Sequence, residues 1–343
     1  MPANPPAGPV ATATGTATGS PTRAGVIHDL GYQRYDGPRY GRPQIIRALA
    51  WHSFRAAFGF GRGAKAKILP VIAILALCLP AIINAFAMSQ GNLRLVGYST
   101  YNPQLRVIVM IIFIAVQAPE LVSKDLRSRV LPLYFSRPIE TIDYPLAKFL
   151  AFTGACLVMM WVPLLVLYGG TIANVHGGAA VWAQTKELIP GLLIGLMWAI
   201  VLAAISLFLA STTGRRAFAT GIVAISFLLT WVLSQILLQV ENNAAQQGGG
   251  PVQAVQGKGG PGSGPIFVHM GPPPPPDLAE KISGLFSPFT LMDGTRMWLH
   301  SSEVGDQVRN PGAFGAVYAL VLVVIVGLCL YGLVARYRKA RLS

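Results

Sequence analysis

Charged residues are scarce in this sequence, and acids are scarcer than bases. Only 12% of the 343 residues are charged, with 13 acidic and 27 basic side chains, whereas 53% are hydrophobic. A composition this poor in charge excludes an ordinary water-soluble domain. The basic excess could suggest nucleic-acid binding, but no cationic cluster lies away from the apolar runs described below, so we expect no nucleic-acid partner.

Cysteine and histidine are also rare, and their spacing does not indicate a disulfide, a metal site or a catalytic site. Cys78, Cys156 and Cys329 each lie inside an apolar run without paired spacing, which argues against a disulfide framework and against a metal site. None of the five histidines lies in such a run. A membrane enzyme needs clustered nucleophiles, acids or metal ligands at membrane depth, so this class is a minor alternative here.

What the chain does have is long apolar runs. Each is near or above the ~18–20 residues that a helix needs to cross about 30 Å of hydrocarbon. We therefore predict an all-α, polytopic membrane protein with six transmembrane helices. The predicted spans are residues 68–88, 105–122, 146–168, 188–211, 217–240 and 313–335.

The basic residues fall in alternate gaps between these spans. Nine of the Lys and Arg residues precede the first span, five lie between the second and third when Lys148 at the start of the third is included, two between the fourth and fifth, and four after the sixth, which makes 20 of the 27. Cytosolic loops carry such an excess. We expect a multi-pass protein of the bacterial cell membrane with both termini in the cytosol.

Composition also divides the chain into regions. Residues 1–42 lack an apolar core, so they do not form a secretory signal, and we expect a largely disordered cytosolic tail. Residues 43–67 should form an interfacial helix and a basic anchor, and 68–335 the transmembrane domain. Within that domain, 241–312 is expected to be an outer loop rich in Gly and Pro, and 336–343 follow as a basic cytosolic tail.

The interfacial helix is predicted over residues 43–60. It opens with a proline suited to a helix start, and polar residues occupy a narrow arc, from which only Arg47 departs. The wide apolar face favours a helix lying in the headgroup layer, with membrane lipid as its partner. The alternative is a helix packed on a cytosolic partner or on the protein's own spans. The residues that we expect at this surface are Ile46, Leu49, Trp51, Phe54, Arg55 and Phe58.

A glycine-rich basic stretch, GFGRGAKAK, follows at residues 59–67. A phosphate-binding loop needs Gly before its Lys and Ser or Thr after it. Ala64 and Ala66 occupy those places, and no strand precedes them. We therefore expect no nucleotide, metal or other cofactor bound by this chain itself, and no enzymatic activity.

The connection at residues 119–148 combines charges, prolines and bulky apolar residues. Glu120 with Lys124, and Asp125 with Arg129, are four residues apart in the acid-first order that supports a helix. Pro132 should interrupt that helix before the chain turns back to the third span. The result is predicted to be a short cytosolic helix and a compact surface for docking a protein. The alternative is a solvated basic loop that only fixes topology.

This connection resembles that of permease subunits of type-2 ATP-binding-cassette (ABC) transporters. In that family an acidic residue leaves the second span, a basic stretch and a Leu-rich turn containing Ser-Arg-Pro follow, and a Tyr and a Lys enter the third span. Here these features are Glu120, residues 125–129, residues 131–139, Tyr144 and Lys148. The six-span order, the helix before the first span and the long outer connection after the fifth also match, from about residue 44 to 341.

The resemblance implies a function that the chain performs with partners. The connection would carry a coupling helix that docks on a separate ABC ATPase chain, which binds ATP and Mg. A second permease subunit, either a copy or a relative, would complete the translocation pathway of an exporter. The residues that the resemblance assigns to ATPase coupling are Glu120, Asp125, Arg127, Arg129, Leu131, Leu133, Tyr134, Phe135, Ser136, Arg137 and Pro138.

Two further sets of residues lie inside the spans. Small residues at intervals of four in the fourth span allow close helix packing, within the subunit or at a dimer interface; they are Gly191, Gly195, Ala199 and Ala203. Polar residues in the fifth span could line a pathway or bond neighbouring helices; they are Thr230, Ser234, Gln235 and Gln239.

An ion-coupled secondary transporter is the main alternative function. It would need buried ionisable groups and interrupted spans in matching repeats. We take Glu120, at the cytosolic end of the second span, as the one ionisable residue within a span, which disfavours a proton relay across the bilayer.

Overall fold

The structure of the protein is a computed structural model. It describes Gly37, residues 41–90, Tyr98, and residues 103–127, 140–248, 252–255, 266–269, 281–282, 284–300 and 312–342. The side chains of the β-strands and of some helix ends are outside this description. The chain divides into two units, Met1–Arg39 and Tyr40–Ser343, and all of the helices described below belong to the second.

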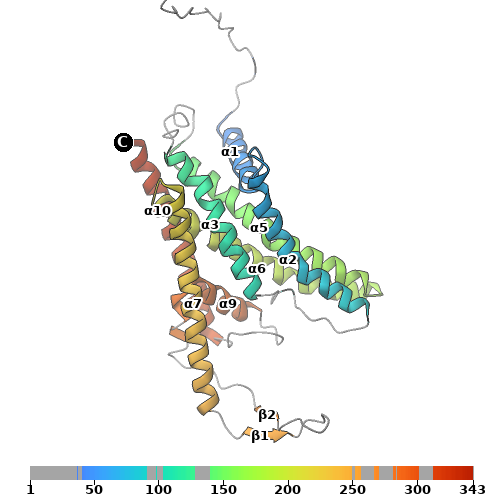
Figure 1. The fold of residues 1–343 in the computed structure, drawn as a ribbon. Coiled ribbons are helices and arrows are strands. Elements are labelled where there is room, and N and C mark those ends of the chain that lie inside the picture. Colours follow the sequence, from blue (N-terminus) through green and yellow to red (C-terminus); the bar gives the residue numbers. More distant parts are fainter. Residues whose placement is uncertain are drawn as a thin grey trace, which may run out of the picture. The chain divides into compact units, whose positions relative to one another are not determined.

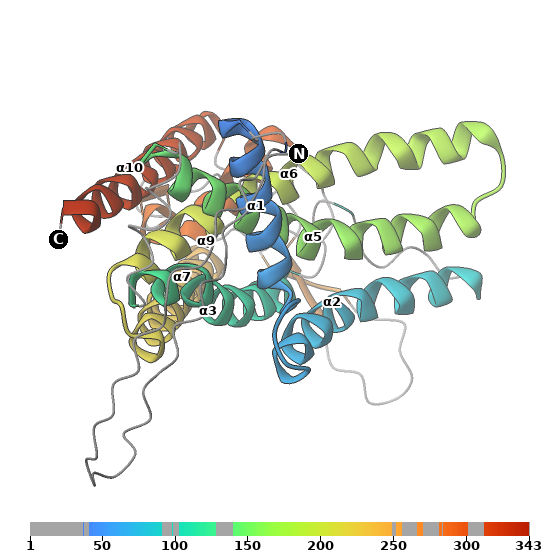
Figure 2. The same cartoon turned by 90° about the horizontal axis from the view of Figure 1, so that it is seen from above.

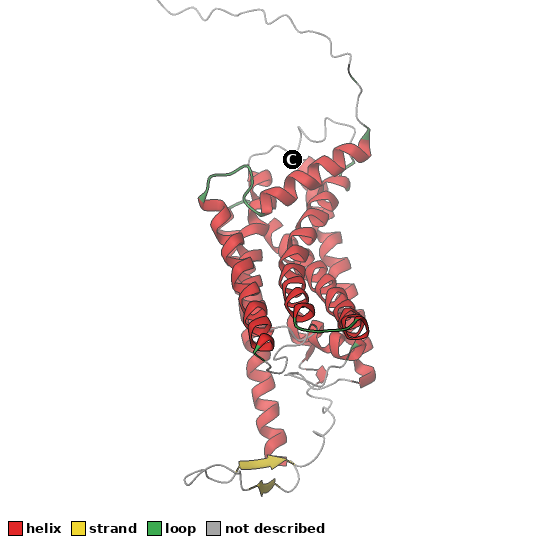
Figure 3. Cartoon of the chain, turned by 90° about the vertical axis from the view of Figure 1, so that its right-hand side faces the viewer, coloured by secondary structure: helices red, strands yellow, loops and turns green. Residues whose placement is uncertain are grey.

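The described chain is helical apart from a small β-hairpin (Figures 1 and 3). Six helices are long and apolar enough to cross a membrane, as predicted. The fold is therefore that of an all-α, multi-pass membrane protein. The six helices are α2 (Lys65–Ser89), α3 (Pro103–Arg127), α5 (Asp143–Ala173), α6 (Gly178–Ser211), α7 (Arg216–Gly248) and α10 (Gly315–Leu342).

The long helices form two adjoining groups, best seen in Figure 2. In one group α5 packs between α2 and α6, and in the other α3 packs on α7 while α10 packs on α9 (Pro288–Leu299). Helices α3 and α6 pack on each other and hold the groups together. With 31 and 34 residues, α5 and α6 reach about 46 Å and 51 Å at helical rise, so their hairpin is longer than the ~30 Å hydrocarbon layer.

The central helix and the outer helices differ in how much of their surface is buried. Helix α3 is the most enclosed span, with Phe113 and Ile114 fully buried, and it packs against Phe152 of α5. Helices α2, α7 and α10 instead expose large apolar side chains along one face, such as Ile225 and Val323. A soluble protein would bury such continuous apolar faces, because exposing them to water is unfavourable. In the hydrocarbon of a membrane they can stay exposed without this penalty.

Helix α1 (Arg42–Ala57) packs on the protein's own spans through one stripe. Leu49, Ser53 and Ala57 are four residues apart and buried, and the helix contacts α5 and α3. Of the predicted interfacial residues, Ile46, Phe54 and Phe58 are partly buried against the same core, whereas Trp51 and Arg55 are exposed. Arg47 lies on the exposed side of the helix beside Trp51, which belongs to the predicted apolar face.

The small-residue stripe of α6 packs inside the chain. A Cβ on Gly191 would lie 3.1 Å from the Cβ of Tyr98, and one on Gly195 would lie 3.3 Å from the ring of Trp161 on α5. Ala199 and Ala203, farther along the stripe, are fully buried. The stripe thus lets other parts of the same subunit approach α6 closely.

Residues 241–312 contain more structure than the predicted loop. Helix α7 continues to Gly248, β1 (Val252–Val255) pairs antiparallel with β2 (Ile266–His269), and α9 follows η1 (Gly284–Phe286). Helix α9 is buried along most of its length, although it is too short to span a membrane. Ser287 caps its first turn by accepting a hydrogen bond from the Phe289 amide, and Pro288 starts the helix. The sequence analysis predicts an outer loop rich in Gly and Pro here and does not predict α9, because Gly and Pro dominate the composition around its start.

The close approach of α2 and α5 gives a test of the packing. Gly170 has Ala85 of α2 directly where a Cβ would lie, while the neighbouring Gly169 faces open space. Gly170→Ala should overpack this contact and cost about 1–3 kcal/mol of stability. Gly169→Ala, the matched control, should be neutral within ~1 kcal/mol. Thermal unfolding of both purified variants in detergent measures the difference, and equal midpoints would contradict the α2–α5 packing.

Candidate functional site

The predicted coupling residues fall partly inside the described chain. Glu120, Asp125 and Arg127 lie on α3, which runs without a break from the span through these residues. The side chain of Arg127 is outside the description, as are the other predicted coupling residues: Arg129, Leu131, Leu133, Tyr134, Phe135, Ser136, Arg137 and Pro138. The charged residues after Pro119 therefore continue the second span instead of forming a separate helix.

Glu120 is held by two arginines from distant parts of the chain. Its side chain is 8% exposed, with Oε1 lying 2.9 Å from Nη1 of Arg62 and Oε2 lying 2.8 Å from Nη1 of Arg216. Arg62 follows α1, and Arg216 is the first residue of α7. One carboxylate therefore joins α3 to two other elements, and each of its oxygens has a guanidinium partner.

A tight turn after α1 delivers Arg62 to this carboxylate. Gly59 has a φ of +77°, and a Cβ there would lie 2.6 Å from the carbonyl oxygen of Ala66, so only glycine fits this turn. Arg62 also donates to the Ala56 carbonyl at the end of α1 and, at 3.2 Å, to Oε1 of Gln117. The glycine-rich stretch thus forms a turn that closes α1 and aims one arginine at α3.

Asp125, one and a half turns further along α3, binds two residues of α5. Nζ of Lys148 lies 2.9 Å from its Oδ2, and the Tyr144 hydroxyl donates to the same oxygen. Tyr144 is fully buried and its ring lies 5.2 Å from that of Tyr337 on α10. The Tyr and Lys on which the family resemblance rests therefore meet the acid of the same connection.

The start of α1 reaches the start of α5. Arg42 forms a two-pronged contact with Asp143, both nitrogen–oxygen distances being 2.8 Å, and also pairs with Glu140. The hydrogen bonds from Asp143 and Glu140 raise the pKa of Arg42 above its usual value. The guanidinium therefore stays charged at any physiological pH.

Together these contacts form what we call the α3 clamp: Arg62, Glu120, Asp125, Tyr144, Lys148 and Arg216. The α3 clamp fixes the last turns of α3 to α1, α5 and α7. A hydrogen bond of 2.9 Å from the Ser123 hydroxyl to the Ala210 carbonyl adds α6. Residues 128–139 leave α3 at the clamp and rejoin the described chain at Glu140, which Arg42 holds.

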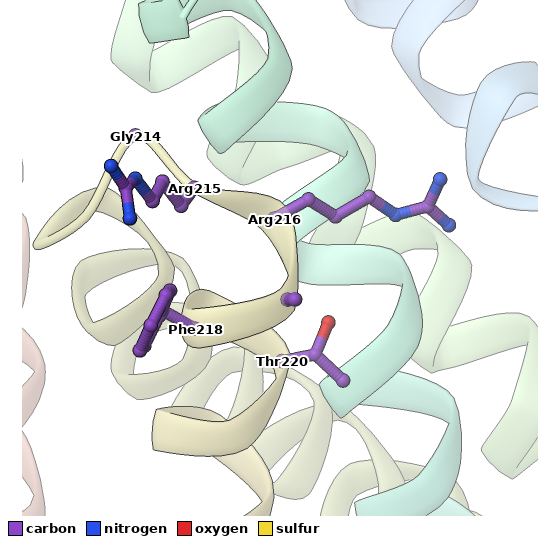
Figure 4. Close-up of a pocket in the computed structure, with 6 residues that line it drawn as sticks. Gly214, Arg215, Arg216, Phe218 and Thr220 are labelled. Carbon is purple, nitrogen blue, oxygen red and sulfur yellow. The ribbon is translucent and has the colours of Figure 1, made fainter.

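A surface hollow lies next to the clamp, at the turn between α6 and α7. It is lined by residues 214–218 and Thr220, and Figure 4 shows Arg215 beside Phe218, with Arg216 extending the opposite way. The Arg215 guanidinium lies 5.9 Å from the centre of the Phe218 ring. Because Arg216 is engaged by Glu120, the hollow presents mainly the charge of Arg215.

The polar residues predicted for a pathway on α7 bond within their own helix. Thr230 donates to the carbonyls of Ser226 and Phe227, and Ser234 donates to that of Trp231. Ser234 is buried, Gln235 is half-buried and Gln239 is exposed. The two hydroxyls are therefore satisfied locally, and their described hydrogen bonds reach no neighbouring helix.

Several partners of Glu120 and Asp125 are not evident from the sequence. Glu120 is not the one ionisable residue within a span, because Arg106 and Lys148 also lie inside spans and both are buried. Arg42, Arg62 and Arg216 were counted only as topology signals. The described partners of Glu120 and Asp125 are far away in sequence, whereas the side chains of Lys124 and Arg129 are outside the description.

Compared with protein-family models and with curated proteins, the chain matches none. Among the described residues, no group of three or more His, Cys, Asp or Glu side chains could hold a metal ion. The most extensive set of specific polar contacts described above is the α3 clamp.

Replacing Glu120 by Gln tests the α3 clamp. The amide keeps the shape but leaves Arg62 and Arg216 without a counter-charge, so we expect a loss of about 1–3 kcal/mol. Glu140→Gln is the control, because this exposed acid pairs at the surface and its loss should cost less than ~1 kcal/mol. Thermal unfolding in detergent compares the two, and a larger effect at Glu140 would contradict the central place of Glu120.

Proposed function

We propose that this chain is the membrane-spanning permease subunit of an ATP-driven ABC exporter. It works as a homodimer or heterodimer with a separate ATPase subunit in the bacterial cell membrane. Residues 128–139 are the segment that docks on the ATPase. The chain itself hydrolyses no ATP, and its work is a change of helix positions around the pathway.

The observation that carries the proposal is the bracing on both sides of residues 128–139. On the α3 side, Asp125 is fixed to Lys148 and Tyr144, and on the α5 side, Glu140 and Asp143 are fixed to Arg42. The residues on both sides of this segment are thus tied to the helices that carry them. A push from a bound ATPase would reach α3 and α5 directly, and α7 through Arg216 and Glu120.

The bracing favours this proposal over a loop that only fixes topology. Such a loop needs positive charge but no specific partners, because the positive-inside rule counts Lys and Arg without regard to their contacts. Here Arg42, Arg62, Lys148 and Arg216 each have a carboxylate partner within 3 Å. Ordering four long side chains costs conformational entropy. A loop that only fixes topology does not need such ordered contacts, whereas a segment that transmits force to the helices does.

The same contacts weaken the case for an ion-coupled secondary transporter. A proton or ion relay needs buried carboxylates that change charge during the cycle. Glu120 and Asp125 are each paired with permanently charged or hydrogen-bonded partners at one end of the bundle. Both carboxylates are therefore engaged by partners that tie helices together, which suits a structural joint.

Docking is tested at Tyr134 and Phe135. If these apolar side chains bury themselves in an ATPase groove, replacing both by Ala should weaken association by ~2 kcal/mol or more. The measurement is the amount of copurified ATPase, identified by peptides that contain a phosphate-binding loop. Phe218→Ala, which removes an exposed aromatic side chain at the start of α7, is the control and should leave association unchanged.

Arg137→Glu gives a second reading of the same surface. Charge reversal should reduce copurification if the groove is acidic, with membrane abundance unchanged because no span is altered. Full ATPase association of both the double-alanine variant and Arg137→Glu would remove the coupling role of residues 128–139.

The orientation is tested with single cysteines at Gly63 and Gly178. A Cβ at either position meets no atom within 4 Å, so both substitutions should be tolerated. In a variant with Cys78, Cys156 and Cys329 replaced by Ala, an impermeant maleimide should label Gly178→Cys in intact cells and Gly63→Cys only after permeabilisation. Labelling in the reverse order would invert the proposed topology.

A further inference from the structure

A second buried charge cluster lies at the start of α3, far along that helix from the α3 clamp. Arg106 is 7% exposed, and Arg296 of α9 is 4% exposed. The Oδ1 atom of Asp293 lies 3.8 Å from Nη2 of Arg106 and 3.6 Å from Nε of Arg296. Two buried guanidinium groups therefore share one carboxylate oxygen, at distances longer than a good hydrogen bond.

Arg106 is poorly satisfied by the protein itself. Its Nε is buried and has no hydrogen-bond partner among the described residues, and its ion pair with Asp293 is a long one. An ionised side chain within a membrane span is costly unless it is paired or serves a function. The cost would be removed by a ligand that accepts hydrogen bonds and carries negative charge.

Trp198 of α6 supplies the second part of the cluster. The Arg106 guanidinium lies over its ring, 4.2 Å from the centroid. Trp198 is fully buried, and its ring packs 5.8 Å from that of Phe289 on α9. Its Nε1 has no hydrogen-bond partner within the described ranges. A guanidinium placed over an aromatic face keeps its N–H groups available, because they point outward in its own plane.

We infer that Arg106 and Trp198 bind an oxyanion, namely a carboxylate or phosphate group, and that Asp293 holds the Arg106 guanidinium in position between α3 and α9. Both donors are buried polar groups without an acceptor in the part of the chain that the structure describes. Arg106 is within one turn of the start of α3, and the last residues of α9, Trp298 and Leu299, are exposed. The inference does not depend on ATPase coupling, because it uses no residue of the α3 clamp.

The group can belong to a small free anion or to the headgroup of an amphiphile. The buried ring of Phe289 packs on Trp198, and that of Phe227 packs on Phe289, so the cluster borders apolar surface that is compatible with either source. The chemistry that Arg106 and Trp198 recognise is the same in both cases. The test below separates the two sources.

The experiment is a titration of the full-length protein, purified in detergent, at constant ionic strength. The probes are inorganic phosphate, acetate and dihexanoyl phosphatidic acid, and heat and tryptophan fluorescence are both recorded. We expect saturable binding of at least one probe. Binding of phosphate or acetate identifies a free anion, and binding of the lipid alone identifies a headgroup.

Variants assign the binding to the cluster. Arg106→Gln should weaken the affinity at least tenfold. Trp198→Phe should weaken it severalfold and abolish the fluorescence change. The matched control is Lys186→Gln, since Lys186 lies 5.5 Å from the ring of Trp182 in an exposed cation–aromatic pair on the same helix, and this variant should bind as the wild type does.

Arg106→Lys keeps the charge but loses the planar fork, so its affinity should fall between those of wild type and Arg106→Gln. If Arg106→Gln does not fold, Arg106→Lys and Trp198→Phe decide the outcome. The inference is overturned if wild type binds none of the three probes saturably, or if the folded cluster variants bind as tightly as Lys186→Gln.

Discussion

The pairing of Glu120 with Arg62 and Arg216 is the contact on which the arrangement at this end of the molecule depends. A carboxylate near the end of the most enclosed helix has to keep its charge compensated, and the two arginines come from segments separated by more than 150 residues of chain. Their convergence fixes the turn after α1 and the start of α7 against α3. A second carboxylate joins α3 to α5 in a similar way, because Asp125 contacts both Lys148 and Tyr144.

Hydrocarbon explains why charge and small residues, and not hydrophobic burial, decide how these helices pack. In lipid, an apolar face gains little by meeting another, so α2, α7 and α10 can leave one face exposed. Specific approach is instead set where a glycine admits a neighbour, as at Gly170 and Gly191. Buried ion pairs also fix the positions of the helices relative to one another, because breaking such a pair leaves an uncompensated buried charge.

The two charge clusters differ in the length of their ion pairs, although Arg62 in the first and Arg106 in the second each have a buried Nε without a hydrogen-bond partner among the described residues. Every charged group of the α3 clamp has an opposite charge within 3 Å, which suits a joint that holds its shape under load. At the start of α3, the ion pair of Arg106 is a long one. The first pattern supports the proposed mount for an ATPase-docking segment, and the second supports the proposed oxyanion site.

The sequence by itself determined the fold class and the six spans, because an apolar run of sufficient length has few alternatives to a membrane helix. It also singled out Glu120, Asp125, Tyr144 and Lys148, but not which of them meet. Tertiary structure alone decided the partners of Glu120, the packing of α1 on α5, and the buried helix α9. The reason is physical: helical periodicity and apolar length are local, whereas an ion pair depends on where distant helices bring their side chains. In the sequence Arg62, Arg106 and Arg216 are all basic residues beside or within apolar runs. Only their neighbours in space distinguish the two arginines of the α3 clamp from a candidate binding group.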